Sequence, residues 1–335
     1  MKFKKTIILA FILTVNLQGF SQEVLTKKEA LRITLANNFG IKIANNNLET
    51  AKNNSSIYNT GLLPTATLSS GASFRRDNQT ITRQDASATS ISGAITKSYN
   101  ASVNLNYILF DGLGRKYNYQ QLKETYNLTA LQARETIENA YVQLFTAYFQ
   151  IARLSENKNN LTEALSISEK RLQRATYQYE YGQSTKLDLL SAEVDVNNDR
   201  LNLINAVQQL SNAKRGLNLI LGVEKEVIYD VETGVDFNEF LNLKELQQKT
   251  TAKNISLKQR EKNIAISEFN IKISKANYLP SLGLNTSYGW NQSENPATSF
   301  LAGSTSNGLN AGLSLSWNLF DGGATKTRVA NAQID

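Results

Sequence analysis

The chemistry open to this chain is limited first by two side chains that it lacks. Its 335 residues include no His and no Cys. A Ser-His-Asp triad, a thiolate nucleophile, a zinc site of imidazoles or thiolates, and a disulfide are therefore excluded. Asp and Glu remain, but none lies in an apolar context that would raise its pKa toward that of a general acid. The composition favours a structural or transport role, with no enzymatic activity, metal or cofactor.

The N-terminus predicts export. MKFKK is a basic leader, an apolar core of about ten residues follows it, and Gly19 and Ser21 offer the small residues of a cleavage site. We expect a signal peptide at 1–21, and no later run is long and apolar enough for a membrane helix. The net charge of +7 falls to +4 without the leader's three Lys, and the remaining basic residues are scattered. This pattern argues against a nucleic-acid partner.

Two halves of the chain resemble each other. Residues 36–64 align without a gap with 252–280, so that Ile41 meets Leu257 and Pro64 meets Pro280. Two segments of alternating hydrophobicity follow each Pro, and each pair ends in Phe-Asp-Gly. A spacing of 210 residues between these motifs (320 − 110) is too long for a solenoid repeat and indicates a duplicated half-molecule. The candidate strand-to-helix junctions are Phe110, Asp111, Gly112, Phe320, Asp321 and Gly322.

The alternating segments predict strands that cross a membrane. Period-two patterning over about ten residues fits a tilted transmembrane strand with an apolar face to lipid and a polar face to the lumen. A half-buried strand of a soluble sandwich alternates in the same way, but export and a small, uncharged polar face favour the membrane. We expect polar outer loops at 75–100 and 291–308, and aromatic girdles at the two interfaces. The predicted lipid-facing residues are Leu282, Leu284, Tyr288, Trp290, Leu313, Leu315 and Trp317.

The number of strands predicts an oligomer. Four strands cannot close a barrel, since about eight is the smallest single-chain solution. Open strand edges are not tolerated in lipid, because their backbone groups would lack partners. Several copies must therefore each contribute two hairpins to one barrel.

A long helical hairpin separates the two strand units. From about 115 to 181 there is no Pro or Gly, and apolar residues recur at coiled-coil spacing. Gly182 interrupts the pattern, and a returning helix, capped by Ser184 or Thr185, ends at Gly222. An earlier helix begins with a Thr26–Glu29 capping box. The predicted first seam is Ile137, Ala140, Leu144, Ala147, Ile151, Leu154, Leu161, Leu165, Ser168, Leu172 and Ala175. The predicted second seam is Leu187, Leu190, Val194, Asn197, Leu201 and Ile204.

Together, the Phe-Asp-Gly junctions, the YGQSTKLDLLSAE turn, the AKRGLNLILG helix end and the Leu-Pro strand starts resemble TolC-type outer membrane factors, the outer membrane efflux protein family. The resemblance implies a mixed α+β membrane protein: a trimeric transmembrane β-barrel with four strands per chain, continued by a long periplasmic α-helical coiled-coil barrel. It also implies a passive exit duct for small molecules or proteins in a tripartite efflux pump or type I secretion system. The implied partners are two further copies of the chain, a periplasmic membrane-fusion adaptor, an inner membrane transporter and outer membrane lipid.

The same resemblance assigns a role to the hairpin tip. In the family the tip loops contact the adaptor, and an exposed reversal with little to bury is free to serve a partner. For Asp188 two interpretations stay open: a residue that lines the pore, or a solvated acid at a helix N-terminus favoured by the helix dipole. The implied adaptor-contacting residues are Gly182, Gln183, Ser184, Thr185, Lys186 and Asp188.

The expected layout follows from these motifs. After the signal peptide come the first periplasmic helices (22–63), the first transmembrane hairpin (64–110), the helical hairpin (111–222), an equatorial connector (223–243), the second-repeat helix (244–279), the second transmembrane hairpin (280–320) and the start of a helix (321–335). The family pattern leads us to expect a second helical hairpin and hence an incomplete chain. The alternative to the channel is a soluble periplasmic coiled-coil scaffold.

Overall fold

The structure is a computed structural model that describes residues 24–223, 229–234, 242–296 and 299–335. The signal peptide expected at 1–21 and most of the expected connector at 223–243 lie outside the described residues. The chain forms two compact units, Met1–Asn46 with Gln132–Ala252 and Asn47–Leu131 with Lys253–Asp335. Helix α4 belongs to both units, because it begins in the second and ends in the first.

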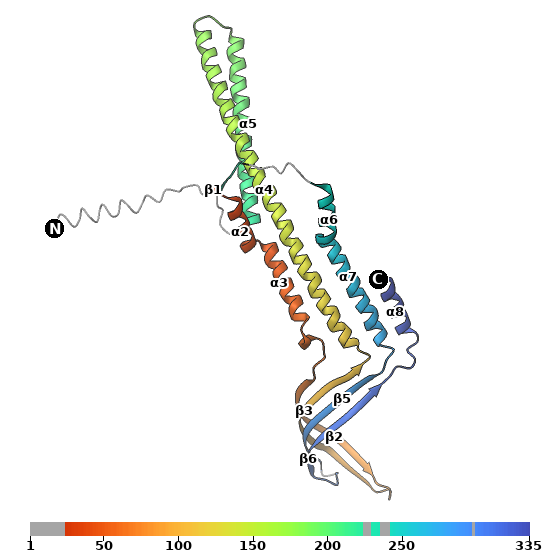
Figure 1. Cartoon of the computed structure of the whole chain (residues 1–335). Helices are drawn as coiled ribbons and strands as arrows, with labels where there is room; N and C mark the ends of the chain where they lie inside the picture. The colour runs from red at the N-terminus through yellow and green to blue at the C-terminus, as the bar shows by residue number, and fades with distance from the viewer. Residues whose placement is uncertain (1–23, 224–228, 235–241, 297–298) are drawn as a thin grey trace, which may run out of the picture. The chain divides into compact units, whose positions relative to one another are not determined.

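The first unit is built on a hairpin of two long helices, seen with its turn in Figure 1. A short parallel pair of strands, β1 with β4, accompanies the hairpin. The elements of this unit, wholly or in part, are β1 (Val24–Leu25), α2 (Lys27–Asn37), α3 (Phe39–Asn54), α4 (Gly114–Glu180), α5 (Lys186–Leu221), β4 (Asp230–Val231) and α6 (Leu243–Lys253).

The second unit contains a four-stranded antiparallel sheet in the order β2-β3-β5-β6. Each half of the chain supplies one hairpin, and β3 pairs with β5 where the halves meet. Figure 1 shows the strands leading directly into the helices of this unit. Its elements are the 3₁₀ turn Ile57–Asn59, β2 (Thr65–Thr82), β3 (Ala88–Asp111), α7 (Ile255–Ala276), β5 (Ser281–Glu294), β6 (Gly303–Ser316) and α8 (Ala324–Ile334). The predicted class, long helices continuing a four-stranded β unit, is confirmed.

The strands are longer than the sequence pattern predicted at their outer ends. Strand β2 continues to Thr82 and β3 begins at Ala88, so the loop expected at 75–100 shortens to 83–87. The loop expected at 291–308 shortens to 295–302. The two segments pair with each other up to Thr82 and Ala88, and this backbone pairing does not require apolar alternation. The expectation of long irregular loops was therefore wrong.

The core of the first unit surrounds Tyr148 of α4, whose side chain is fully buried. The Tyr148 hydroxyl donates a hydrogen bond to the Leu25 carbonyl (2.7 Å) and accepts one from the Glu232 amide (3.0 Å). One hydroxyl thus ties β1 and the residue that follows β4 to α4. Burial raises the pKa of Tyr148, because the phenolate would lose its hydration.

Helices α4 and α5 pack along a heptad seam, and only one side of this seam was predicted correctly. The seam predicted on α4 is buried or half-buried at every position, as expected. On α5 the predicted stripe is exposed instead, with Leu187 72% and Leu201 59% exposed. As far as Leu210, the buried or half-buried residues of α5 form a second stripe with the same heptad period: Leu189, Ala192, Val196, Asp199, Leu203, Ala206 and Leu210.

A polar layer interrupts the apolar seam. The buried Ser168 hydroxyl of α4 donates a hydrogen bond to Asp199 of α5, and the adjacent pair Arg200 and Glu169 is joined at 3.4 Å. A polar pair at one seam position penalises a shifted register, because its groups would lose their partners. The layer therefore aligns the two helices along their length.

The duplication inferred from sequence appears in the helix breaks of both halves. Asn38, between α2 and α3, accepts a hydrogen bond from the Ile41 amide (3.2 Å). Asn254, between α6 and α7, accepts the equivalent bond from the Leu257 amide (3.1 Å). The segment expected as one helix at 244–279 is thus two helices, since an Asn side chain replaces a helical bond at the break.

Candidate functional site

The two Phe-Asp-Gly motifs form matching strand-to-helix turns. Asp111 accepts a hydrogen bond from the Arg115 amide (3.0 Å), and Asp321 accepts one from the Thr325 amide (2.8 Å). In each turn the next two residues have positive φ: 68° and 70° at residues 112 and 113, and 67° and 85° at residues 322 and 323. Each carboxylate caps the first turn of the following helix. Hydrogen bonds from Thr325, first from its side chain, lower the pKa of Asp321.

The junctions differ in how firmly they are held. In the first, the Arg115 guanidinium contacts Asp111 at 2.9 Å and donates to the carbonyls of Ile108 (2.5 Å) and Gly61. Ile108 lies beside a bulge in β3, where the ladder with β5 shifts register. The Arg115 guanidinium gives the Ile108 carbonyl a hydrogen-bond partner at this irregularity. In the second junction Phe320 is 89% exposed and Thr325 stands where the first has Arg115. Sequence reasoning missed Arg115, although its spacing of four residues from Asp111 is that of a helix salt bridge.

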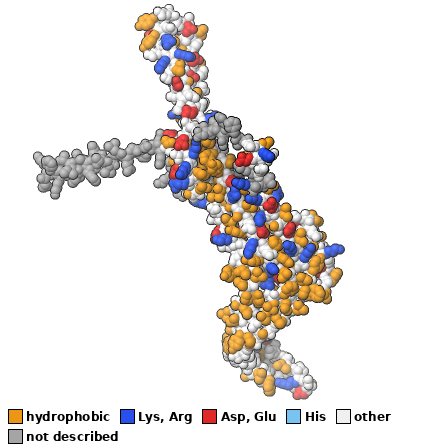
Figure 2. Space-filling view, in the orientation of Figure 1, with side chains coloured by type: hydrophobic (Ala, Val, Ile, Leu, Met, Phe, Trp, Pro, Cys, Tyr) orange, Lys and Arg blue, Asp and Glu red, His pale blue; other side chains and the backbone are white. Residues whose placement is uncertain are grey.

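The sheet has one apolar face that continues across all four strands. Residues directly opposite one another in antiparallel strands point to the same face. Leu284 is opposite Leu313 and Leu282 is opposite Leu315, so these four predicted residues share one face. Figure 2 shows hydrophobic side chains gathered over the strands near the helices. A row across the whole sheet is Leu68, Val103, Tyr288 and Leu309.

Two predicted lipid-facing aromatics lie in different settings. Trp290 is opposite Ala101 in the ladder, on the apolar face, as expected for its position in β5. Trp317 lies one residue past the end of β6, so it is not a strand residue. Its indole N–H donates to the Tyr278 carbonyl at 3.0 Å, beside the turn that enters β5.

The opposite face of the sheet is polar and uncharged over its inner rows. Thr67, Asn104, Ser287 and Asn310 form one row, and Thr65, Asn106, Asn285 and Gly312 form the next. A shallow pocket of about 190 Å³ lies on these rows, lined mainly by Asn104, Asn106, Asn285, Ser287 and Asn310. Amide and hydroxyl groups of this kind interact with water and neutral solutes without selecting a charge.

The tip of the helical hairpin is a capped reversal. Gly182 has φ +72°, and Thr185 and Asp188 form a reciprocal capping box at the start of α5. The Asp188 carboxylate accepts from the Thr185 hydroxyl (2.7 Å), the Thr185 amide (3.0 Å) and the Ser184 hydroxyl (3.0 Å). These bonds, the Thr185 hydroxyl first, lower the pKa of Asp188. Gln183, Lys186 and Leu187 around the box are exposed.

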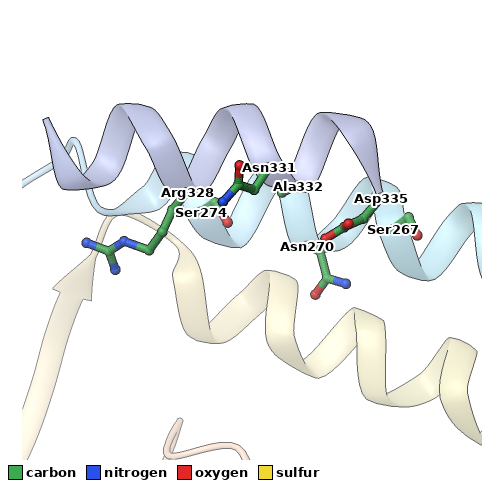
Figure 3. A pocket seen from close by; sticks show the side chains of 7 residues that line it. All are labelled: Ser267, Asn270, Ser274, Arg328, Asn331, Ala332 and Asp335. Atoms are coloured by element: carbon green, nitrogen blue, oxygen red, sulfur yellow. The ribbon is translucent and has the colours of Figure 1, made fainter.

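A groove between α7 and α8 is another hollow of the second unit. It encloses about 230 Å³, and its walls are small or polar side chains of the two helices. Figure 3 shows the lining residues of α7 and α8, with Ser267 and Ser274 beside the α8 strip and Asn270 pointing away from α8. The Asn270 amide oxygen accepts a hydrogen bond from Gln121 of α4. The groove follows the contact line of two helices, so we interpret it as a packing seam. Within the described ranges, no group of three or more acidic side chains is arranged to hold a metal ion.

The chain matches known outer membrane proteins over most of its length. The family described as outer membrane efflux protein matches residues 30–223 and 246–335. The outer membrane protein TolC of Vibrio cholerae is 22% identical over 275 residues, which is 82% of this chain and 60% of TolC. Protein CyaE of Bordetella pertussis is 23% identical over 70% of this chain and 49% of CyaE. The chain therefore spans about half to three-fifths of these relatives.

Solved structures agree in fold. The Campylobacter jejuni CmeC outer membrane channel superimposes with a TM-score of 0.75 at 16% identity, over 92% of this chain and 64% of CmeC. CusC superimposes with a TM-score of 0.70 at 16% identity, over 92% of this chain and 68% of CusC. The chain belongs to the outer membrane efflux protein family. Its place is the outer membrane, with the helices as a periplasmic extension. In the parts of the chain that the structure describes, no helix is both long and apolar enough to cross a bilayer.

Proposed function

We propose that this chain is one subunit of a passive outer membrane channel, the exit duct of a tripartite efflux pump or a type I secretion system. The observation that carries the proposal is the four-stranded sheet, with one apolar face across all strands and one neutral polar face. Such a sheet fits lipid on one side and an aqueous lumen on the other. No reacting group is needed for passive conduction.

The sheet also supports assembly of several copies. Strands β2 and β6 are the two edges of the described sheet, and each leaves a row of backbone groups without a ladder partner. In lipid those groups must be paired, so β6 of one copy is proposed to pair with β2 of the next. Three copies would give the twelve strands implied by the family resemblance.

The helical hairpin supports the same assembly. The exposed stripe of α5 repeats every seven residues, and Leu187, Leu190, Val194, Leu201 and Ile204 are 46–72% exposed. A helix that already uses one seam for α4 and keeps a second apolar seam open is suited to a second helical neighbour. We propose that this neighbour is another helix of the assembled channel.

The test of assembly uses the absence of native Cys. Single Cys residues are placed at edge positions of β2 and β6, and oxidation of outer membranes is expected to give covalent dimers and trimers. Trimers that resist SDS and dissociate only on heating are expected in parallel. A monomer that leaves the outer membrane fraction on washing would contradict the proposal.

The tip is proposed as the adaptor contact. Gly182, Gln183, Ser184, Thr185, Lys186 and Asp188 form an exposed turn whose internal hydrogen bonds leave its outer surface free. Cys at Gln183 or Lys186 is expected to crosslink to a periplasmic adaptor co-expressed with the chain. Cys at Asp85 or Asn295, in the loops at the outer ends of the strands, serves as the control. Crosslinks only from these loops would reverse the proposed orientation.

A further inference from the structure

Basic side chains lie on the apolar face of the sheet in a basic row, Phe74, Lys97 and Glu294, with Arg76 one row further out and opposite Ile95. On β2, Arg76 follows Phe74 by two residues and therefore lies on the same face. Lys97 of β3 is opposite Phe74 on one side and Glu294 of β5 on the other. Arg75, the immediate neighbour of Arg76, points to the polar face. Charged side chains thus lie on the proposed lipid face, toward the ends of the strands that are remote from α4, and β2 continues beyond them to Thr82.

The rows just inside this one are aromatic. Tyr99 lies two residues from Lys97 along β3, and Trp290 lies in the row after that, opposite Ala101. From Tyr99 to Phe110 is 11 residues (110 − 99). At about 3.3 Å per residue and a tilt of about 40° this spans about 28 Å, close to the apolar band of about 25 Å in outer membrane barrels. The basic row therefore falls at the headgroup level of the outer leaflet.

The basic side chains in and beside this row differ in whether they form an ion pair. Lys97 pairs with Glu294 at 3.2 Å, and Arg75 lies 3.8 Å from Asp77. Among the described residues, the structure records no ion pair for Arg76. On the apolar face, Lys97 and Glu294 balance each other, and Arg76 adds one positive charge on an exposed guanidinium.

The backbone beside Arg76 leaves room for its guanidinium. Gly93 of β3 has φ +72°, and a Cβ there would lie 3.0 Å from the Arg76 Nε. Asn78 holds this bulge by accepting hydrogen bonds from the Gly93 amide (2.8 Å) and the Ser92 hydroxyl (3.0 Å). The guanidinium thus lies against the backbone of the neighbouring strand, which restricts its motion before any ligand binds.

We propose that Arg76, assisted by Lys97, binds the phosphate of an outer-leaflet membrane lipid. The inference rests on the proposed membrane position of the sheet. A planar guanidinium matches a phosphate in two parallel hydrogen bonds. The apolar face that begins at Phe74, two residues from Arg76 along β2, accommodates acyl chains. Arg on a lipid-facing strand costs little only near the interface, where such a phosphate is present.

The experiment measures lipid bound to the intact chain. Protein from outer membranes is purified in detergent, and lipid A per chain is counted by native mass spectrometry. Arg76→Gln is expected to retain about five-fold less lipid A than wild type, and the double variant with Lys97→Gln still less. Arg76→Lys is expected to recover part of the loss, because it restores the charge. Gly93→Ala is expected to weaken binding by displacing the guanidinium.

Arg75→Gln is the matched control, because it removes the same charge one residue away on the polar face. It is expected to retain lipid A at the wild-type level. Dephosphorylated lipid A should bind weakly to wild type, and inorganic phosphate should not displace lipid A. Equal loss in Arg75→Gln and Arg76→Gln, no loss in Arg76→Gln, or displacement by inorganic phosphate would each overturn the inference. Wild-type protein missing from washed outer membranes would instead refute the proposed function, and the inference with it.

Discussion

At the scale of single residues, Gly112 and Gly322 share a conformation but differ in their surroundings. Their φ values are 68° and 67°. A Cβ at Gly112 would lie 2.4 Å from the Ala276 carbonyl oxygen and 2.9 Å from Leu279 Cβ, whereas a Cβ at Gly322 meets nothing within 4 Å. The first glycine is thus required by close approach as well as by φ.

We expect Gly112→Ala to be markedly more destabilising than Gly322→Ala. Both variants incur about 1–2 kcal/mol for a left-handed alanine. Gly112→Ala adds the cost of moving α7 backbone, about 1–3 kcal/mol. Thermal unfolding in detergent measures the difference, with Gly322→Ala as the control. Equal losses of stability in the two variants would contradict the close packing of α7 against the first junction.

The capping box at the tip predicts a response to acid. The folded pKa of Asp188 is lowered, so its contribution is complete above the ordinary Asp value of about 3.9 and is lost as pH falls through the lower folded value. Thr185→Ala should cost about 1 kcal/mol at neutral pH, because it removes the helix cap. It should also raise the pKa of Asp188 toward its ordinary value, measured by NMR titration. An unchanged pKa would exclude the Thr185 hydrogen bond as its cause.

At the scale of elements, α5 carries two heptad stripes with different neighbours. Val196 belongs to the seam with α4 and is 3% exposed, whereas Val194 belongs to the open stripe and is 56% exposed. The two residues have the same side chain, the same helix and nearly the same depth along it. Substitutions at these two positions can therefore distinguish folding of the hairpin from its assembly with other helices.

We expect Val196→Asp to destabilise the hairpin by about 3 kcal/mol or more, because a carboxylate would be buried without a partner. Val194→Asp should change the stability of the hairpin by less than about 0.5 kcal/mol, yet weaken oligomers. Loss of helical circular dichroism on heating measures the first effect, and SDS-resistant oligomers measure the second. A Val194→Asp variant that assembles normally would argue against the open stripe as a contact between helices.

At the scale of the whole molecule, the two faces of the sheet should tolerate charge differently. Leu313→Arg is expected to cost about 2–4 kcal/mol near the bilayer centre and to impair membrane assembly. Ser314→Arg, one residue along β6, points to the polar face and should be tolerated. The amount of each variant in outer membranes, compared with wild type, is the measurement. Equal tolerance of the two arginines would contradict the assignment of one face of the sheet to lipid.

Local patterns in the sequence determined much of this protein. The absence of His and Cys, the alternation of Leu309, Leu313 and Leu315, and the unbroken helical stretch before Gly182 each depend on neighbouring residues alone. The aligned halves also placed Asn38 opposite Asn254, although their role as helix breaks was not inferred. Fold class and family follow from these patterns, because period and composition need no knowledge of distant contacts.

Tertiary structure alone decided which surfaces meet. Leu187 and Leu189 begin stripes of equal period on α5, and only the packing on α4 selects the second. Arg115 gained its role because the fold brings the carbonyls of Gly61 and Ile108 to its guanidinium. The outer halves of β2 and β3 lack apolar alternation, so only their mutual backbone pairing makes them strands. In each case the deciding energy comes from a partner remote in sequence, which a local pattern does not contain.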